Sequence, residues 1–346
     1  MAAGYPSGTN TFIPSTEATN NLVVDFSRNP SKFALPKWIQ YVPVEKNVGR
    51  YIEMTVEMAG RVLSTDGSEL RWPDGTTAPS GSGNTESFEF KPYSTVRHAL
   101  PFWLGELAVE QAAWDVLAQH ARITAQRAMT NRSLQAITAA VTSGNYLAAH
   151  TSAVSSITGV TGAWDVSTTS RKDIKRSFDH AAETIQKATL GAVDPSDMMV
   201  VMSPGCARKL SVSQEIVDHV KGSPAAEREL KEGLGPNTRY GLPARLYGYE
   251  IVIEDTVRVS TRKGATTTKS FALADATPFM TSRVGELEGV EGSPSFSTWS
   301  LFLKEEMTVE SKHDRDNRRH EGRVVDDFDV INSSQLSGFL FTSAVS

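Results

Sequence analysis

The side chains that could bind a metal ion gather in one stretch of the sequence, 311–323. His313, Asp314, Asp316, Asn317 and His320 carry the imidazole, carboxylate and amide groups that coordinate divalent cations. The same stretch also carries five basic side chains that would repel a cation. These are Lys312, Arg315, Arg318, Arg319 and Arg323. The pattern therefore predicts an exposed turn of mixed charge, with no metal site.

The sequence lacks the familiar catalytic motifs. It has no phosphate-binding loop, no His-Glu-x-x-His and no nucleophile-elbow serine. Gly81 and Gly83 lack the third glycine and the following helix of a dinucleotide site. Five further histidines are isolated in sequence and are interpreted as structural or solvated: His98, His120, His150, His180 and His219. We expect a protein that is not an enzyme and that uses no cofactor.

Composition excludes several other classes. The single cysteine, Cys206, rules out an intrachain disulfide and a cysteine-built metal site, and its place after Ser203-Pro204-Gly205 suits a small helix residue. A net charge of −5 argues against a sequence-specific reader of nucleic acid. No stretch approaches the roughly 18 apolar residues of a membrane span. The first residues lack the features of a signal peptide, so we expect synthesis in the cytoplasm.

The longest periodic segment, 105–143, predicts one long helix. It contains no proline and no glycine after Gly105. Apolar and small residues recur at intervals of three, four or seven, and at 1.5 Å per residue the helix would be about 50–60 Å long. Gln111, Arg132 and Gln135 fall where a coiled-coil seam requires apolar residues. We therefore favour a helix that braces its own domain over a coiled coil.

The first half of the chain predicts two extended features. Residues 1–48 are punctuated by prolines and carry scattered aromatic residues, which indicates an arm laid on another surface. From Tyr51 the residues alternate between apolar and polar, and alternation returns near Phe88 and Phe90. The segment between, about 65–85, is rich in turn-forming residues. Because a lone two-stranded hairpin is marginal in water, we expect its apolar face to rest on a neighbouring subunit.

The second half predicts a compact α/β domain. A helix begins near Ser170 and ends at Gly191, the run 198–202 is a buried strand, and Ser203-Pro204 begins another helix. A further helix is expected at 225–232, before a loop at 233–243. The remaining expected strands are 249–254, 271–274, 296–303, 307–310, 324–331 and 338–341.

This order of elements resembles the major capsid proteins of tailed phages, the Hong Kong ninety-seven fold family. Segments 246–255 (LYGYEIVIED) and 271–275 (FALAD) look like strands of its A-domain. Segments 314–317 (DRDN), 321–331 and 334–341 (SQLSGFLF) are similar to its C-terminal run through the P-domain and back into the A-domain.

The resemblance implies an α+β fold with an N-arm, an extended E-loop hairpin, a P-domain with a long spine helix and an α/β A-domain. The implied boundaries are 1–48 for the arm, 49–97 for the hairpin, 98–169 for the P-domain with the spine helix at about 105–143, 170–294 for the A-domain, 295–330 for returning P-domain strands and 331–346 for the last A-domain strand.

The implied function is an icosahedral shell of hexamers and pentamers around double-stranded DNA, assembled in the host cytoplasm and located in the virion. The expected contacts between subunits are Phe12, Phe26, Trp38, Ile52, Met54, Val56, Met58, Trp72, Phe88 and Phe90. Arg315, Arg318 and Arg319 form a candidate basic contact patch; the alternative is pairing within the chain to Asp326 and Asp327.

Two departures from the family bear on partners. Some members crosslink an E-loop lysine to an asparagine, but no lysine lies between Lys46 and Lys91, so we expect no covalent crosslink. Some begin with a cleaved, helical scaffolding segment; residues 1–48 look unlike one, so we expect an uncleaved N-terminus and a separate scaffolding protein and portal. The resemblance also admits a decoration protein outside the shell. The alternatives are an encapsulin-type compartment and an oligomeric cytoplasmic α/β enzyme. A fibre is the least favoured alternative, because the sequence contains no repeats.

Overall fold

The computed structural model of the chain describes residues 32–53, 72–76, 89–112, 115–165, 172–221, 240–261, 266–283 and 297–346. The described helices are α1 (Leu35–Trp38), α3 (Glu106–Glu110), α4 (Val116–Ala140), α5 (Asp173–Ala188), α6 (Pro204–Ser211) and α7 (Gln214–Lys221), with short 3-10 turns at Ser143–Asn145, Ala148–His150, Val154–Ser156 and Pro195–Asp197. The described strands are β1 (Gln40–Pro43), β2 (Val48–Glu53), β3 (Glu89–Ser94), β4 (Val96–Gly105), β5 (Thr151–Ala153), β6 (Met198–Met202), β7 (Arg245–Leu246), β8 (Tyr249–Ile253), β9 (Val257–Val259), β10 (Lys269–Phe271), β11 (Phe279–Ser282), β12 (Trp299–Asp314), β13 (Arg319–Asn332) and β14 (Phe339–Thr342).

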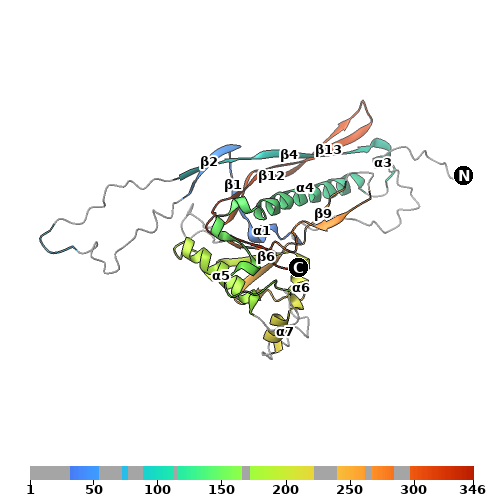
Figure 1. The fold of residues 1–346 in the computed structure, drawn as a ribbon. Coiled ribbons are helices and arrows are strands. Elements are labelled where there is room, and N and C mark those ends of the chain that lie inside the picture. The colour runs from blue at the N-terminus through green and yellow to red at the C-terminus, as the bar shows by residue number, and fades with distance from the viewer. Residues whose placement is uncertain are drawn as a thin grey trace.

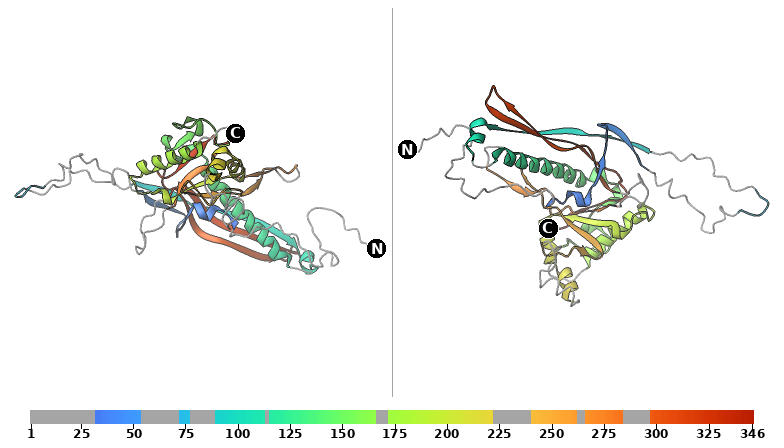
Figure 2. Two further views of the ribbon diagram at one scale, coloured as in Figure 1. Left: turned by 90° about the horizontal axis from the view of Figure 1, so that it is seen from below. Right: turned by 180° about the vertical axis from the view of Figure 1, so that it is seen from behind.

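The described chain has two main layers (Figure 1). An elongated four-stranded sheet, in the order β1-β12-β13-β4, has α4 lying along one face. Below it, a six-stranded sheet in the order β5-β14-β11-β6-β8-β7 is combined with α5 and α6. The view from behind shows α4 between the elongated sheet and the α/β unit (Figure 2).

The six-stranded sheet forms the α/β unit that the sequence predicted. All five residues of β6 are buried, and β6 pairs in parallel with β8 and antiparallel with β11. One face of the sheet packs on the apolar side of α5, where Ile174, Phe178 and Ile185 are fully buried. The predicted strand 271–274 is shifted: β10 ends at Phe271, and Leu273 is buried beyond the strand.

Helix α5 (Asp173–Ala188) ends close to the predicted residue Gly191, whereas the predicted start at Ser170 lies outside the described residues. Gly191 adopts φ +81° and its amide donates to the Gln186 carbonyl, but Leu190, with φ +53°, holds the position directly after the C-cap Thr189 where glycine is usual. At the other end, the Glu215 carboxylate accepts hydrogen bonds from the amides of Ile174 (2.8 Å) and Lys175 (3.0 Å). A side chain from α7 therefore satisfies two of the free amides at the start of α5.

The prediction of one helix over 105–143 was wrong, because two helices occupy it. Helix α3 closes at Gln111, and α4 begins only after Asp115, whose carboxylate accepts from the amide of Ala118 at 2.9 Å. Asp115 thus acts as an N-cap inside the expected helix. At 1.5 Å per residue, the 25 residues of α4 span roughly 37 Å.

The buried face of α4 is more polar than the predicted apolar stripe. Thr124, Arg132 and Ser133 are all buried on it. Ala128 packs near β4 and β13, whereas Ile137 and Ala140 belong to the core next to the six-stranded sheet. The helix therefore contacts both units of the chain, as expected of a brace.

A buried ion pair joins α4 to β13. Arg132 donates from Nε to one Asp326 carboxylate oxygen at 3.1 Å and from a terminal nitrogen to the other. The two residues are 7% and 1% exposed. The guanidinium carbon also lies 5.5 Å from the Phe328 ring centre and 6.0 Å from that of Tyr41. The fork geometry and the aromatic faces together suit arginine and not lysine.

The described end of the expected arm folds onto the chain itself. Strand β1 pairs in parallel with β12, and α1 precedes it. Trp38 is fully buried: its ring centre lies 5.2 Å from that of Phe279, and its Nε1 donates to Glu254 at 3.1 Å. Trp38, expected to contact another subunit, is therefore a core residue.

Glu254 is a buried carboxyl group held by neutral donors. Besides Trp38, it accepts from the Thr256 hydroxyl at 2.5 Å. Burial raises the pKa of Glu254 above its ordinary value of 4.5, although the hydrogen bonds from Thr256 and Trp38 oppose the shift. Deprotonation at neutral pH therefore costs stability.

We predict that Arg132→Ala destabilises the fold by about 3–5 kcal/mol, because it leaves the Asp326 carboxylate buried without a partner. Urea unfolding of the unassembled chain measures the cost. In a double-mutant cycle with Asp326→Ala, the double variant should lose less than the sum of the single losses. Arg127→Ala, an exposed arginine of the same helix, is the matched control. Equal costs for the two arginine variants would contradict the assignment.

We predict that Glu254→Gln makes stability less dependent on pH. A carboxyl whose folded-state pKa is raised contributes stability that is fully present below the unfolded-state pKa, near 4.5, and is lost as pH rises through the folded-state value. The difference in unfolding free energy, variant minus parent, should therefore grow as pH rises above the unfolded-state pKa. Glu250→Gln, at an exposed position of β8, is the control. A difference that stays flat with pH would refute the role of Glu254.

Candidate functional site

Two projections, and not a cleft with catalytic groups, distinguish the described surface. The first is the pair β2–β3, which extends away from the body (Figure 1). Its register joins Ile52 to Phe90 and Val48 to Ser94, so the predicted hairpin pairing is confirmed in the described strands. Within one strand pair only alternate residues can face the body, and the others face solvent.

Of the expected contact residues, Phe90 lies on this projection, and Trp72 lies in the separately described stretch 72–76. Phe90 is 55% exposed and Trp72 is 64% exposed. Trp72 donates from its indole nitrogen to the Thr76 carbonyl at 2.7 Å. The expected contacts Phe12, Phe26, Met54, Val56, Met58 and Phe88 lie outside the described residues, as does the Ile52 side chain.

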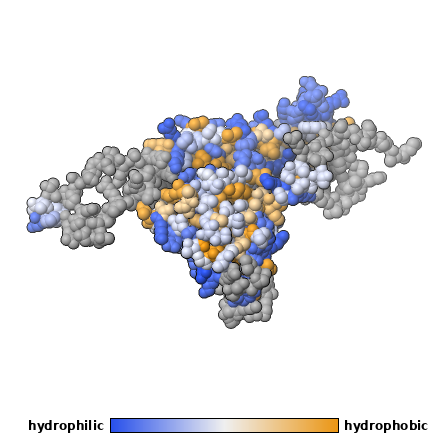
Figure 3. Space-filling view, in the orientation of Figure 1, coloured by the Kyte–Doolittle hydropathy of each residue, from blue (hydrophilic) through white to orange (hydrophobic). Residues whose placement is uncertain are grey.

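The second projection is the tip of the β12–β13 hairpin. The sequence predicted two strands in β12 and a charged turn over 311–323, but β12 is continuous with register shifts near Glu305, and the turn spans only the residues between Asp314 and Arg319. Cross-strand ion pairs explain how so charged a stretch remains in strands. In the space-filling view this tip is a strongly hydrophilic projection (Figure 3).

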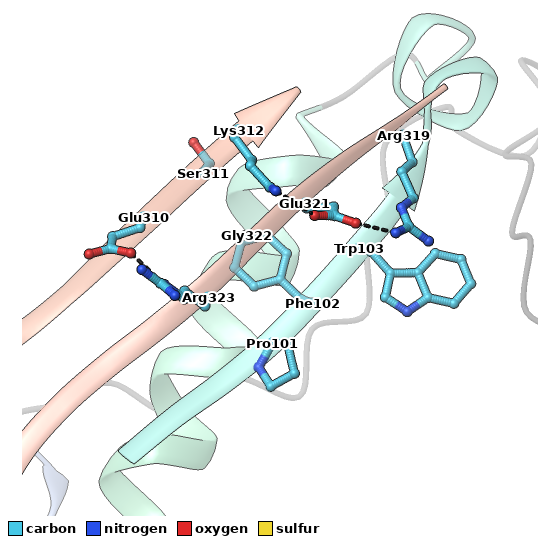
Figure 4. Close-up of a pocket in the computed structure, with 10 residues that line it drawn as sticks. All are labelled: Pro101, Phe102, Trp103, Glu310, Ser311, Lys312, Arg319, Glu321, Gly322 and Arg323. Atoms are coloured by element: carbon cyan, nitrogen blue, oxygen red, sulfur yellow. Dashed lines mark hydrogen bonds and ion pairs between the residues drawn. The ribbon is translucent and has the colours of Figure 1, made fainter. Parts of the chain in front are cut away.

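The charged side chains pair along one face of this hairpin (Figure 4). Arg323 contacts Glu310 at 2.5 Å. Further toward the tip, Glu321 accepts from Lys312 at 3.3 Å and from Arg319. Each pair is partly exposed, so each contributes little to stability by itself.

Trp103 lies on the same face and was not recognised in the sequence. The register pairs it with Glu321, and its side chain is 51% exposed beside a depression of about 510 Å³. Figure 4 shows the indole next to Arg319. The signal was present: residues 96–105 alternate, and the adjacent Phe102 and Leu104 are buried on the opposite face, toward α4. Exposed Trp and Arg together are typical of protein contact surfaces.

The three basic residues proposed as a patch have different environments. Arg315 and Arg318 are exposed at the turn, whereas Arg319 is engaged by Asp314 and Glu321. The alternative of pairing with Asp326 and Asp327 is wrong. Asp326 binds Arg132, and Asp327 lies 3.5 Å from Arg97.

The groups considered for chemistry are dispersed or buried. Cys206 is fully buried, and burial raises the pKa of its thiol well above the usual range. Burial also lowers the pKa of His150, which hydrogen-bonds the Gly338 carbonyl at 2.8 Å. The ring centres of His313 and His320 lie 4.7 Å apart. In the described ranges, however, no group of three or more His, Cys, Asp or Glu side chains is placed so that it could hold a metal ion. None of the described helices is long and apolar enough to span a membrane.

The comparisons with known proteins identify the fold. No protein-family model and no curated protein sequence matches the chain. A phage-related protein from Bordetella bronchiseptica RB50 matches with a TM-score of 0.61 at 18% identity, over 92% of this chain and 94% of that one. The capsid structure of the cyanophage P-SCSP1u matches with a TM-score of 0.55 at 10% identity, over 95% and 92%.

A structure of the SrpI encapsulin complex from Synechococcus elongatus PCC 7942 also matches, with a TM-score of 0.51 at 9% identity, over 93% of this chain and 92% of that one. Because each likeness extends over nearly the whole of both chains, it concerns the complete arrangement of layers and projections and not one shared motif. The chain therefore has the mixed α+β Hong Kong ninety-seven fold that tailed-phage capsid proteins and encapsulins share.

Proposed function

We propose that this chain is the major capsid protein of a tailed phage and that it assembles into hexamers and pentamers of an icosahedral shell around double-stranded DNA. The observation that carries the proposal is the likeness over nearly the whole chain to phage capsid structures, including that of cyanophage P-SCSP1u. The β2–β3 projection supports it, because the apolar side chain of Phe90 on it is exposed and would be buried by a contact with another molecule.

The proposed division follows the boundaries expected from the sequence. Residues 1–48 are the arm, 49–97 the E-loop hairpin, 98–169 and 295–330 the P-domain, and 170–294 with 331–346 the A-domain. The pairing of β13 with β4 and of β14 with β11 supports the return of the chain to each domain. The spine helix is α4 alone, preceded by the short α3.

Assembly proceeds through many modest contacts. At about 25 cal/mol per Å² of buried apolar area, Phe90 and Trp72 on each hairpin contribute small free energies that accumulate over a shell. The net charge of −5 suits a wall that does not hold its DNA tightly, because phosphate binding grows with the number of Lys and Arg contacts. Arg315 and Arg318 remain the proposed basic contacts. A separate scaffolding protein and a portal are the proposed partners. The proposal also allows for a decoration protein bound to the outside of the shell.

An encapsulin-type compartment is the second candidate, and one observation favours it: the likeness to the SrpI encapsulin complex has nearly the same extent. The two candidates differ in content. A phage shell encloses DNA, whereas an encapsulin encloses protein. The expected extended, proline-rich N-terminal arm supports the phage proposal.

Electron microscopy of the purified chain, expressed with and without the products of its neighbouring genes, tests the proposal. We expect closed polyhedral shells or free rings of five and six subunits. Nuclease-protected DNA inside supports the phage assignment, and protein cargo inside supports the encapsulin. A small discrete oligomer under all conditions would overturn both.

We predict that Phe90→Asp abolishes or strongly reduces shell formation without lowering the unfolding temperature of the unassembled chain, because the side chain is more than half exposed and its proposed contacts lie on another subunit. Sedimentation measures assembly, and thermal scanning measures the fold. Val212→Asp, at a 66% exposed apolar position outside the hairpin, is the matched control. Assembly of Phe90→Asp at the parent level would contradict the proposed contact.

A further inference from the structure

The projecting strands β2–β3 are attached to the body at their base by a stack of aromatic rings. Tyr93 of β3 lies face to face with Phe302 of β12, with ring centres 4.7 Å apart and planes 6° apart. The ring centre of Tyr51 of β2 lies 5.6 Å from that of the same Phe302 ring. Both strands of the projection therefore rest on one side chain of the long sheet.

At position 49, opposite Tyr93, this stack accommodates glycine. The two residues are register partners, and the Tyr93 ring lies across the Gly49 backbone. A Cβ added at Gly49 would lie 2.5 Å from Cζ and 2.6 Å from Cε1 of that ring, closer than real carbon atoms approach. A side chain at position 49 would therefore require the Tyr93 ring to shift from its place on Phe302.

Polar contacts hold the same base in a fixed orientation. The Ser94 amide donates to an Asp329 carboxylate oxygen at 2.9 Å, and the Lys304 ammonium donates to the Asn47 side-chain oxygen. The Thr95 amide donates to the Asn47 carbonyl at 2.8 Å. These contacts involve β3, β12, β13 and the residue that precedes β2. The base is therefore held both at the end of β3 and at the residue before β2.

We propose that Gly49, Tyr93 and Phe302 form an aromatic clamp that fixes the direction in which the β2–β3 projection leaves the body. The clamp acts through geometry, because rotating the strand pair about its base requires the Tyr93 ring to leave Phe302. Gly49, Tyr93 and Phe302 are thus positioning residues for the proposed contact of Phe90. The consequence for assembly rests on the proposed function, whereas the clamp itself does not.

Distance measurement between spin labels tests the clamp in the full-length, unassembled chain. Labels are attached at Phe90→Cys on the projection and at Val212→Cys on the body, both exposed positions. The native Cys206 is fully buried and remains unlabelled. We expect one narrow distance distribution in the parent and the loss of that single narrow peak in Gly49→Ala and in Phe302→Leu.

Three further variants separate the clamp from a general loss of fold. Gly144→Ala is the matched control, because an added Cβ meets nothing within 4 Å there, and it should retain the parent distribution. Tyr93→Phe keeps the ring and should also match the parent. In a Tyr93→Ala background, Gly49→Ala should add nothing, because the ring that it displaces is gone.

A narrow, parent-like distribution in Gly49→Ala would overturn the proposal, as would an additive effect in the Tyr93→Ala background. Shell formation by the unlabelled variants is scored separately by electron microscopy. If the parent forms no shells, the proposed function fails while the distance distributions still decide the clamp. If Gly49→Ala loses the narrow peak and still forms parental shells, the clamp stands but its role in assembly is refuted.

Discussion

The bidentate ion pair between Arg132 and Asp326 is the interaction on which the elongated half of the molecule depends. It is nearly inaccessible to solvent, and it joins the middle of α4 to the middle of β13. Such a pair offsets the cost of removing two charges from water only when its geometry is good and its surroundings satisfy the remaining atoms. The rings of Phe328 and Tyr41 supply part of that environment. Because Tyr41 belongs to β1, the pair also connects the N-terminal part of the described chain to the brace.

A polar pair at this position specifies how the helix is placed. An apolar stripe on α4 could slide along the sheet by a turn with little loss, whereas a forked guanidinium has only one carboxylate to meet. The alanines at 128, 136 and 140 let the helix approach closely on either side of the pair. The helix is thereby fixed both to the long sheet and to the α/β unit, so a displacement of one layer would have to displace the other.

The charged and aromatic side chains of the long sheet are arranged on its outer face. Acidic and basic side chains on the outer face of β12 and β13 satisfy one another, and Trp103 stands among them. Among the buried titratable groups, Glu254 is held by neutral donors and Cys206 lies in the apolar core. Chemistry at a reacting bond needs titratable groups that converge on one accessible point. Here the exposed features are spread over two projections.

The sequence by itself determined the elements whose signal is local. The buried run 198–202, the end of α5 close to Gly191, the serine cap before α6 and the pairing of β2 with β3 were all predicted, because each depends on neighbouring residues or on simple alternation. The order of these elements was enough to suggest the fold class, since that order reflects how layers can be stacked.

Only the tertiary structure decided which residues meet across the chain. Arg132 interrupts an apolar pattern, and its partner lies 194 positions away, so nothing near it in sequence distinguishes a buried ion pair from a solvated charge. Trp38 was assigned to a contact between subunits because its own segment offers no core; its core is Phe279 and Glu254, far along the chain. Likewise, the break before α4 depends on Asp115 acting as a cap in a segment of good helix formers. Burial and pairing are properties of the folded arrangement, and a linear pattern records them only where the partner is close in sequence.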